Sequence, residues 1–341
     1  MRRSLLTLTA VAAIVVSGCG SGSPTESQTA VRLTVYTDQH MELIDALTSA
    51  YTSETGVEFR IQGDSSYGQV EAEGAASPAD IFLSEDPGEV ALLGKAELIE
   101  PLDDDVLDHV RPGLSSPDNL WVAYAARARV LFYNPELIDE QDLPTSLFDL
   151  ADPEYIDRFA YAPSGAFQAT TQYLLSDIGK EDTTDFLTAI KDHGVDELKN
   201  GNVRDTVEAG KHSMGISNHY YWYRKAAEVG GEENMTSRIY HFPDEDPGNL
   251  ILSSGAGILA SSEMKAEAKK FLSWLTSEDG GQQILMHGDI EVSGAQYPVA
   301  IGTHSDIAGS LDEIASPPYD MGIYADQTEA LDLLKRLGML S

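Results

Sequence analysis

Residues 31–62 read VRLTVYTDQHMELIDALTSAYTSETGVEFRIQ and contain two different hydrophobic periods. Over 31–35 apolar residues alternate with polar ones, which is the pattern of a strand with one buried face. From Met41 onward apolar residues recur every three or four positions, as on one face of a helix, and Gly56 stands where that helix would end. Alternation resumes over 57–61. The stretch therefore predicts a strand, a helix and a second strand.

The segments that follow continue this alternation. A short helix is expected over 67–74 and a buried strand over 79–83, which completes a β-α-β-α-β series typical of a largely parallel α/β lobe. A long apolar run at 121–133 then leads into a second series. The further elements expected are strands at 159–162 and 214–217, helices at 167–178, 220–229, 263–275 and 328–337, and a strand-rich stretch at 250–259.

A chain of 341 residues is long for one compact core, so two lobes are predicted. The fold class expected is α/β, with a mixed, largely parallel sheet flanked by helices in each lobe and a hinge between them. The first lobe would comprise 31–122 plus 250–300, and the second 123–249 plus 301–341. Ligands of such folds bind at strand and helix ends between the lobes, which close over them.

The N-terminal residues have the pattern of a lipoprotein signal peptide over 1–18. Arg2 and Arg3 precede an uncharged apolar run that is too short for an ordinary membrane-spanning helix. Small residues lead into Cys19, as in a bacterial lipobox, so lipidation of Cys19 is expected, with 19–30 as a flexible tether. An ordinary signal peptide with an incidental cysteine is the alternative. Since Cys19 is the only cysteine, no disulfide can form within the chain.

The composition limits the partners. With 42% hydrophobic residues the chain fits a folded globular protein, and its formal net charge is −34. Such a field repels phosphate backbones, so no nucleic acid is expected as a partner. We interpret the acidic surface as solvation that mildly favours the approach of a cation.

The stretch SNHYYWY at 217–223 carries the sharpest chemical signal. Neighbouring side chains of a strand point to opposite faces, but at a strand-to-helix turn they diverge by about 100°, so Tyr220 and Tyr221 can both reach one cleft. By itself this heptapeptide is better explained by aromatic packing or a sugar-binding platform. A ferric ion, however, selects anionic oxygen ligands and displaces protons from phenols well below their usual pKa of ~10.

A carboxylate and an imidazole follow two strands of the first lobe. The segment TDQH ends at His40 after the first strand, and Glu85 follows the third, which places both at the edge facing the cleft. Alone, His40 is better explained as a helix-capping histidine and Glu85 as part of a charged turn. Their joint placement with the paired tyrosines indicates a metal site.

Six segments resemble, in the same order and over nearly the whole mature chain, those of bacterial ferric-ion-binding proteins called periplasmic transferrins. These segments are VYTDQH, SPADIFLSED, YAPSGAF, LKNGNV, NHYYW and DPGNLILSSGAGIL. The resemblance implies a two-lobed, type II-like periplasmic-binding-protein fold. It also implies a function, namely capture of Fe(III) with a synergistic anion and delivery to an ABC permease and its ATPase. We expect a monomer on the outer face of the cytoplasmic membrane, held there only by its lipid anchor.

The resemblance also implies individual site residues. The Fe(III) ligands would be His40, Glu85, Tyr220 and Tyr221. The anion-binding positions would be Ser164, Gly165, Ala166, Asn200 and Asn218. The segment PSGAF opens an expected helix, where backbone amides and the helix dipole favour an anion. A plain helix cap at Ser164 is the alternative explanation.

Three positions depart from the pattern of the family or leave its anion open. His219 stands where relatives more often have Asn, so a second imidazole near the metal could add pH sensitivity. Arg127 and Arg129 lie on one face of their strand, and some relatives use arginine to hold carbonate. The anion expected is phosphate, with carbonate as the alternative.

Other functions remain alternatives from the sequence. The protein could bind another solute, such as a ferric chelate, phosphate alone or another oxyanion, or it could be a sensor or adhesin. We do not expect an enzyme, because the chain contains no G-x-S-x-G elbow, no H-E-x-x-H motif and no P-loop.

Overall fold

The computed structural model describes residues 31–163, 165–318 and 321–340. The predicted signal peptide, Cys19 and the tether fall outside these ranges, as does Ser164. The chain divides into two units, 1–30 and 31–341, and the second unit is described from here on.

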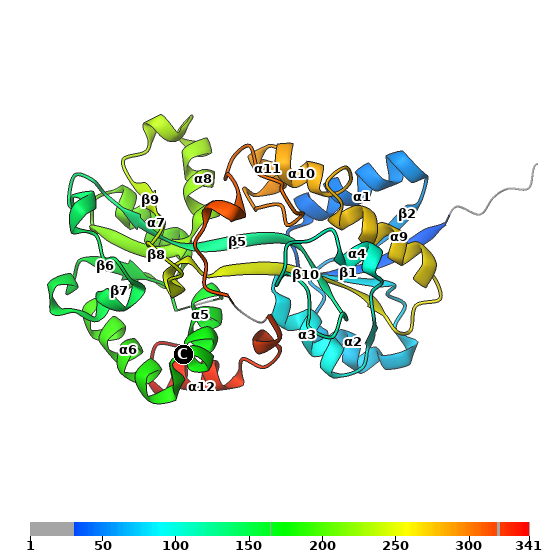
Figure 1. Ribbon diagram of the computed structural model, residues 1–341, viewed down its shortest axis with the longest axis horizontal. Coiled ribbons are helices and arrows are strands. Elements are labelled where there is room, and N and C mark those ends of the chain that lie inside the picture. The colour runs from blue at the N-terminus through cyan, green and yellow to red at the C-terminus, as the bar shows by residue number, and fades with distance from the viewer. Residues whose placement is uncertain (1–30, 164, 319–320, 341) are drawn as a thin grey trace, which may run out of the picture. The chain divides into compact units, whose positions relative to one another are not determined.

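Eight of the ten described strands form one path of hydrogen-bonded neighbours in the order β2-β1-β3-β10-β5-β8-β6-β7, and β4 and β9 pair beside this path (Figure 1). β1 is parallel to β2 and β3, and β6 is parallel to β7 and β8. β10 is antiparallel to β3, β4 and β5, and β5 is antiparallel to β8 and β9. The bounds are β1 Arg32–Thr37, β2 Glu58–Gln62, β3 Ile81–Ser84, β4 Ile99–Glu100, β5 Val122–Tyr133, β6 Phe159–Tyr161, β7 Val195–Asp196, β8 Met214–Asn218, β9 Arg238–Tyr240 and β10 Ile251–Leu259.

Two long strands, β5 and β10, cross from one half of this path to the other. β5 pairs with β10 over 122–128 and then with β8 over 129–133, and each of its residues is buried. The register of β10 shifts between Ser253 and Gly255, as at a β-bulge. We call β5 and β10 the crossing strands.

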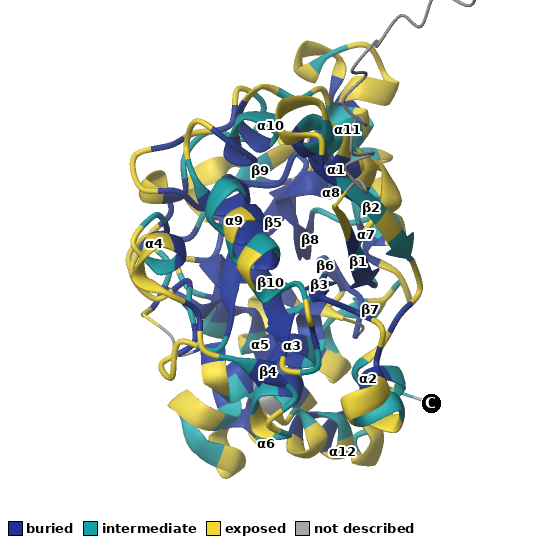
Figure 2. Ribbon diagram, turned by 90° about the vertical axis from the view of Figure 1, so that its right-hand side faces the viewer, coloured by how far each residue is buried: buried dark blue, intermediate teal, exposed yellow. Residues whose placement is uncertain are grey.

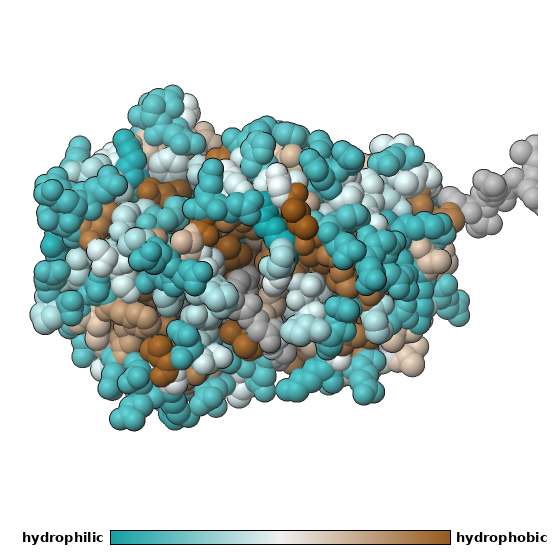
Figure 3. Space-filling view, viewed as in Figure 1, coloured by the Kyte–Doolittle hydropathy of each residue, from teal (hydrophilic) through white to brown (hydrophobic). Residues whose placement is uncertain are grey.

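Helices flank both halves of the sheet path. In Figure 2 most strands are dark blue and therefore buried, although β2 is largely intermediate, whereas the helices expose their outer faces. Hydrophilic residues dominate the face of the molecule in Figure 3, with apolar residues in patches between them. No helix within the described ranges has the length and apolar composition needed to cross a bilayer. The bounds are α1 Met41–Thr55, α2 Tyr67–Glu73, α3 Pro87–Lys95, α4 Asp104–Leu107, α5 Ala166–Asp177, α6 Gly179–His193, α7 Asn200–Glu208, α8 His219–Glu228, α9 Lys265–Thr276, α10 Gln282–His287, α11 Ile290–Ser293 and α12 Thr328–Arg336.

Two large hydrophobic clusters form the cores of the lobes. The first gathers residues of β1, β3, α1 and α9, and the second those of β6, α5, α6 and α12. Leu311, Ile314 and Met321 pack in the first cluster, whereas Leu333 packs in the second. The fold is thus the expected two-lobed α/β class, while the exact lobe bounds given above stay a prediction.

The local predictions agree with the observed elements. α1 ends at Gly56, whose φ of 76° is left-handed and costs glycine little. β8 ends at Asn218 and α8 begins at His219, so the tyrosine pair does stand at a strand-to-helix turn. α6 and α7 were not singled out from the sequence.

Gly255 offers a test of how closely the crossing strand packs. A Cβ at this position would lie 2.3 Å from Val90 Cγ1. We expect Gly255→Ala to lower the free energy of unfolding by about 1–3 kcal/mol, because the added methyl overpacks the first lobe. Urea unfolding of the apo protein measures this change. In the double variant with Val90→Ala the loss should be smaller than the sum of the two single losses, and simple additivity would contradict the proposed clash.

Candidate metal-binding site

The turn between β1 and α1 is tied to the end of β3. Thr37 Oγ1 donates to the carbonyl of Leu83 at 2.7 Å and accepts the amide N–H of Gln39 at 3.0 Å. The amide N–H of Glu85 donates to Asp38 Oδ1 at 2.8 Å. Burial raises the pKa of Asp38 to about 7. These bonds fix the two segments that carry the predicted first-lobe ligands.

His40 and Glu85 lie together at the ends of these strands. His40 Nε2 is 3.9 Å from Glu85 Oε1, with 45% and 33% of the two side chains exposed. His40 is the N-cap residue of α1, yet its side chain makes no capping hydrogen bond. Helix capping therefore does not explain this histidine, and both side chains remain accessible to a ligand.

Tyr220 and Tyr221 lie side by side in the first turn of α8. Their ring centroids are 4.4 Å apart with an interplanar angle of 31°. Asn218 Nδ2 donates to the Tyr220 hydroxyl at 3.4 Å. Burial raises the pKa of Tyr220 above its usual value, while the N-terminus of α8 favours negative charge nearby. The phenol is therefore protonated at neutral pH unless a cation displaces the proton.

His219 is held away from any metal by its own contacts. Its Nδ1 accepts the amide N–H of Ala128 at 3.2 Å, so Nε2 carries the hydrogen that is donated to the carbonyl of Ala295 at 2.7 Å. The ring stacks on Tyr297 with centroids 4.3 Å apart. Burial lowers the pKa of His219 to about 3. Because both ring nitrogens are occupied, this arrangement does not support His219 as a second imidazole at the metal.

The two arginines of β5 have different environments, although they share one strand face. Arg127 donates to the carbonyl of Glu85 at 2.8 Å and forms an ion pair with Asp86. Arg129 donates through Nη1 to Asn218 Oδ1 at 2.9 Å, but its buried Nε and Nη2 have no hydrogen-bond partner among the described residues. Burial lowers the pKa of Arg129 to about 10. Arg129 is thus a buried cation with N–H groups that have no acceptor among the described residues.

The predicted anion-binding residues gather around β8 and the start of α5. Asn218 is 2% exposed, and Asn200, in the first turn of α7, is linked to the same strand through the Ser217 hydroxyl, which donates to its Oδ1 at 3.3 Å. Gly165, with φ of 48°, and buried Ala166 begin α5. Ser164 lies outside the described residues. Arg129 lines a small cavity together with residues of α5, among them Phe167 and Thr170.

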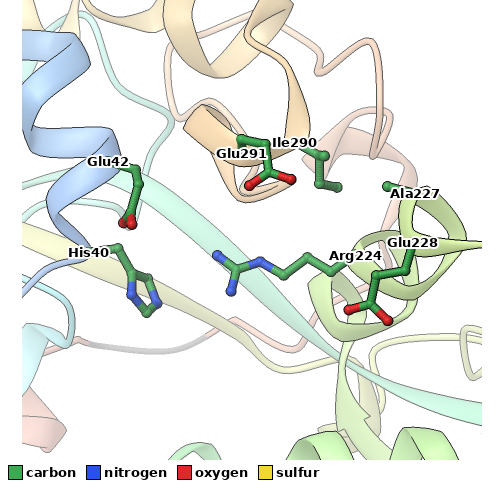
Figure 4. Close-up of a pocket in the computed structure, with 7 residues that line it drawn as sticks. All are labelled: His40, Glu42, Arg224, Ala227, Glu228, Ile290 and Glu291. Carbon is green, nitrogen blue, oxygen red and sulfur yellow. The ribbon is translucent and has the colours of Figure 1, made fainter.

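A pocket of about 360 Å³ lies between elements of the two lobes. Figure 4 shows Arg224 pointing from α8 across this pocket toward His40 and Glu42, and its Cζ lies 5.5 Å from the centroid of the Tyr220 ring. The lining residues are His40, Glu42, Arg224, Ala227, Glu228, Ile290 and Glu291. The pocket therefore adjoins His40 of the first lobe, and Arg224 connects its second-lobe wall to the ring of Tyr220.

The structure brings His40 next to Glu85 and Tyr220 next to Tyr221. It shows no direct bond between these two pairs. Within the described ranges, neither tyrosine forms a hydrogen bond or ion pair with His40 or Glu85, and no group of three or more His, Cys, Asp or Glu residues could hold a metal. Sequence reasoning missed Arg224, although its position four residues after Tyr220 places it on the same helix face.

The fold and these side chains define a class of protein: two α/β lobes joined by crossing strands, with ligand-type side chains on each side of an interlobe pocket. Residues 36–282 match the family model described as bacterial extracellular solute-binding protein. The chain belongs to this family.

Several relatives resemble the chain over most of its length. The "Fe(3+)-binding periplasmic protein" of Serratia marcescens is 34% identical over 313 residues, covering 90% of each chain. The "Major ferric iron-binding protein" of Neisseria meningitidis serogroup A is 33% identical, covering 90% of this chain and 93% of the relative. Among solved structures, iron-bound HitA from Pseudomonas aeruginosa is 34% identical with a TM-score of 0.79, covering 90% of this chain and 99% of HitA.

The buried, neutral His219 predicts a specific dependence of stability on pH. Its pKa is about 3 in the folded state, against an ordinary ~6.5 when unfolded, so below pH ~6.5 only the unfolded chain takes up this proton. The stabilisation is therefore complete above pH ~6.5 and is lost as the pH falls toward 3. The free energy of unfolding of the apo protein should fall less steeply with falling pH in His219→Gln than in the wild type. The two slopes should differ by about 1.4 kcal/mol per pH unit over this window. Equal slopes in urea unfolding of the two proteins would contradict this assignment.

Proposed function

We propose that this protein is the extracytoplasmic Fe(III)-binding component of an ABC importer, which captures the ion between its lobes with a synergistic anion and delivers it to a permease and its ATPase. The observation that carries the proposal is the pair of adjacent phenols at the start of α8, a helix whose Arg224 lines one pocket together with His40. The names of the Serratia and Neisseria relatives, which describe ferric-iron-binding proteins, support it. The ligands proposed for Fe(III) are His40, Glu85, Tyr220 and Tyr221.

The charges of these four side chains suit a trivalent cation. Two phenolates and one carboxylate balance three positive charges, and a hard cation prefers such oxygen ligands. Because burial raises the pKa of Tyr220, only a strongly polarising ion displaces its proton at neutral pH. The start of α8 then stabilises the phenolates.

A synergistic anion is proposed next to this ion. Arg129 is buried with unpartnered donors, and a buried cation is costly unless an anion pairs with it. Asn218 and Asn200 supply uncharged amides nearby, and the start of α5 supplies backbone N–H groups. The anion proposed is phosphate, with carbonate as the alternative. Because Arg127 already pairs with Asp86, it contributes less to the anion than Arg129 does.

An oxyanion as the only solute is the second candidate function. The two unpartnered donors of Arg129 favour it, because they need no metal to be satisfied. This alternative leaves the approach of His40 to Glu85 and the tyrosine pair without a role. Fe(III) with an anion accounts for both sets of residues.

We propose lipidation at Cys19 and a tether over 19–30, because the sequence before Cys19 has the pattern of a lipobox. The protein would act as a monomer on the outer face of the cytoplasmic membrane, with the lobe bounds predicted above.

Iron binding tests the proposal through the colour of the complex. Adding ferric citrate to the apo protein should produce a visible phenolate-to-iron charge-transfer band, and Tyr221→Phe should weaken both the band and the affinity. The loss in affinity should exceed about 100-fold, since outer-shell partners of metal ligands alone are worth 10- to 100-fold.

Tyr223→Phe is the matched control, because Tyr223 lies on the same helix and packs edge-on against Trp222. It should leave the band unchanged. A colourless mixture without bound iron, or equal binding by wild type and Tyr221→Phe, would defeat the iron assignment.

Arg129→Met tests the anion. Removing a buried, incompletely paired charge should raise the unfolding temperature of the apo protein and abolish the dependence of iron affinity on added phosphate or carbonate. Arg127→Met is the control: it leaves Asp86 without its partner, so it should lower the unfolding temperature and retain the anion dependence. Calorimetry and iron titration with and without each anion measure both effects. Loss of stability in Arg129→Met with unchanged anion dependence would contradict the proposed anion site.

A further inference from the structure

Gln39 connects a predicted iron ligand to both crossing strands. Its Oε1 accepts the amide N–H of His40 at 3.0 Å. Its Nε2 donates to Ser254 Oγ of β10 at 2.8 Å and to the Tyr124 hydroxyl of β5 at 3.3 Å. Gln39 is 4% exposed, and Tyr124 and Ser254 are fully buried. Each of these polar groups therefore depends on the others for its hydrogen bonds.

The same network reaches the second first-lobe ligand. The Tyr124 hydroxyl donates to the carbonyl of Ser84 at 3.3 Å, and Ser84 directly precedes Glu85. Both turns that carry first-lobe ligands thus share partners on the crossing strands. Gln39 is the closer link, because it bonds to the backbone of His40 itself.

The network lies where the crossing strands are irregular. Ser254 stands at the register shift between Ser253 and Gly255, and such bulges bend a strand and increase its local twist. Because β5 and β10 run between the lobes, a movement of the lobes relative to each other changes the twist of these strands. Such a change displaces Ser254 and Tyr124 relative to the β1–α1 turn.

We propose that Gln39 is a positioning residue that transmits bending of the crossing strands to His40. With the lobes closed, its amide holds His40 in place for the metal. When the strands bend, the amide follows Ser254 and Tyr124 and shifts the backbone of His40, so release of the ion begins at this ligand. This inference rests on the proposed function of the site.

Gln282 provides a matched control for a purely structural role. It is fully buried, donates through Nε2 to the carbonyls of Tyr124 and Leu275 at 2.9 Å each, and accepts the amide N–H of Val299 at 2.7 Å. It thus makes as many hydrogen bonds as Gln39 and also contacts β5. No hydrogen bond joins Gln282 to the β1–α1 turn among the described residues.

The experiment measures the rate of iron release to excess chelator, alongside the unfolding temperature of each apo variant. Gln39→Leu and Gln282→Leu should both lower the unfolding temperature, but only Gln39→Leu should speed release, by about 10- to 100-fold as for other residues that support a metal ligand. Ser254→Ala leaves Gln39 in place and should speed release by a smaller factor. In a His40→Ala background, Gln39→Leu should add no further acceleration, because its effect passes through His40.

Three outcomes would overturn the inference while the proposed function stands: wild-type rates in both Gln39→Leu and Ser254→Ala, equal acceleration in Gln282→Leu, or a full additional effect of Gln39→Leu in the His40→Ala background. If Gln39→Leu does not fold, a wild-type release rate in Ser254→Ala alone overturns the inference. A wild-type protein that binds no iron would overturn the proposed function together with this inference.

Discussion

The antiparallel pairing of β5 with β10 is the constraint on which the arrangement of the site depends. Along β5 the hydrogen-bonding partner changes from β10 to β8 between Ala128 and Arg129, so one continuous strand belongs to both lobes. The strand therefore carries Arg127 beside the end of β3 and Arg129 beside the end of β8. Because Arg127 and Arg129 are close neighbours on one strand, the ends of β3 and β8 approach each other along it.

The ligand-type groups near these strand ends differ in charge before a ligand binds. The phenol of Tyr220 is neutral because burial raises its pKa, while Arg127 is compensated by Asp86. Arg129 has no such compensation. It donates one hydrogen bond to the neutral amide of Asn218, and its Nε and Nη2 have no partner among the described residues. A protein that must bind an ion and later give it up benefits from this balance, because the anionic ligands form only when the cation displaces their protons.

The sequence predicted local structure well, for physical reasons that act within a few residues. Gly56 ends α1 because it adopts a left-handed φ, and β8 ends at Asn218, so that the tyrosine pair falls in the first turn of α8. The strand ends and the family resemblance together predicted His40 and Glu85 as the first-lobe partners of the tyrosines. The structure then placed His40 beside Glu85, although their sequence positions are far apart.

Other features depend on contacts that the sequence does not encode locally. Gln39 meets Ser254 across 215 residues, and nothing near either residue signals that bond. His219 was a candidate metal neighbour because it precedes Tyr220. Its hydrogen bond to the carbonyl of Ala295 and its stacking on Tyr297 instead make it part of the packing between elements. Arg127 and Arg129 look equivalent in sequence, and only the position of Asp86 distinguishes the paired guanidinium from the unpaired one.

The central claim is that side chains from both lobes meet around one ferric ion when the lobes close. Anomalous diffraction at the iron absorption edge from crystals of the iron-loaded protein tests it most directly. The account predicts a single iron peak bonded to the hydroxyl oxygens of Tyr220 and Tyr221 and to His40 and Glu85. An iron peak that lacks the two phenols, or one bound by a single lobe in a closed protein, would contradict it.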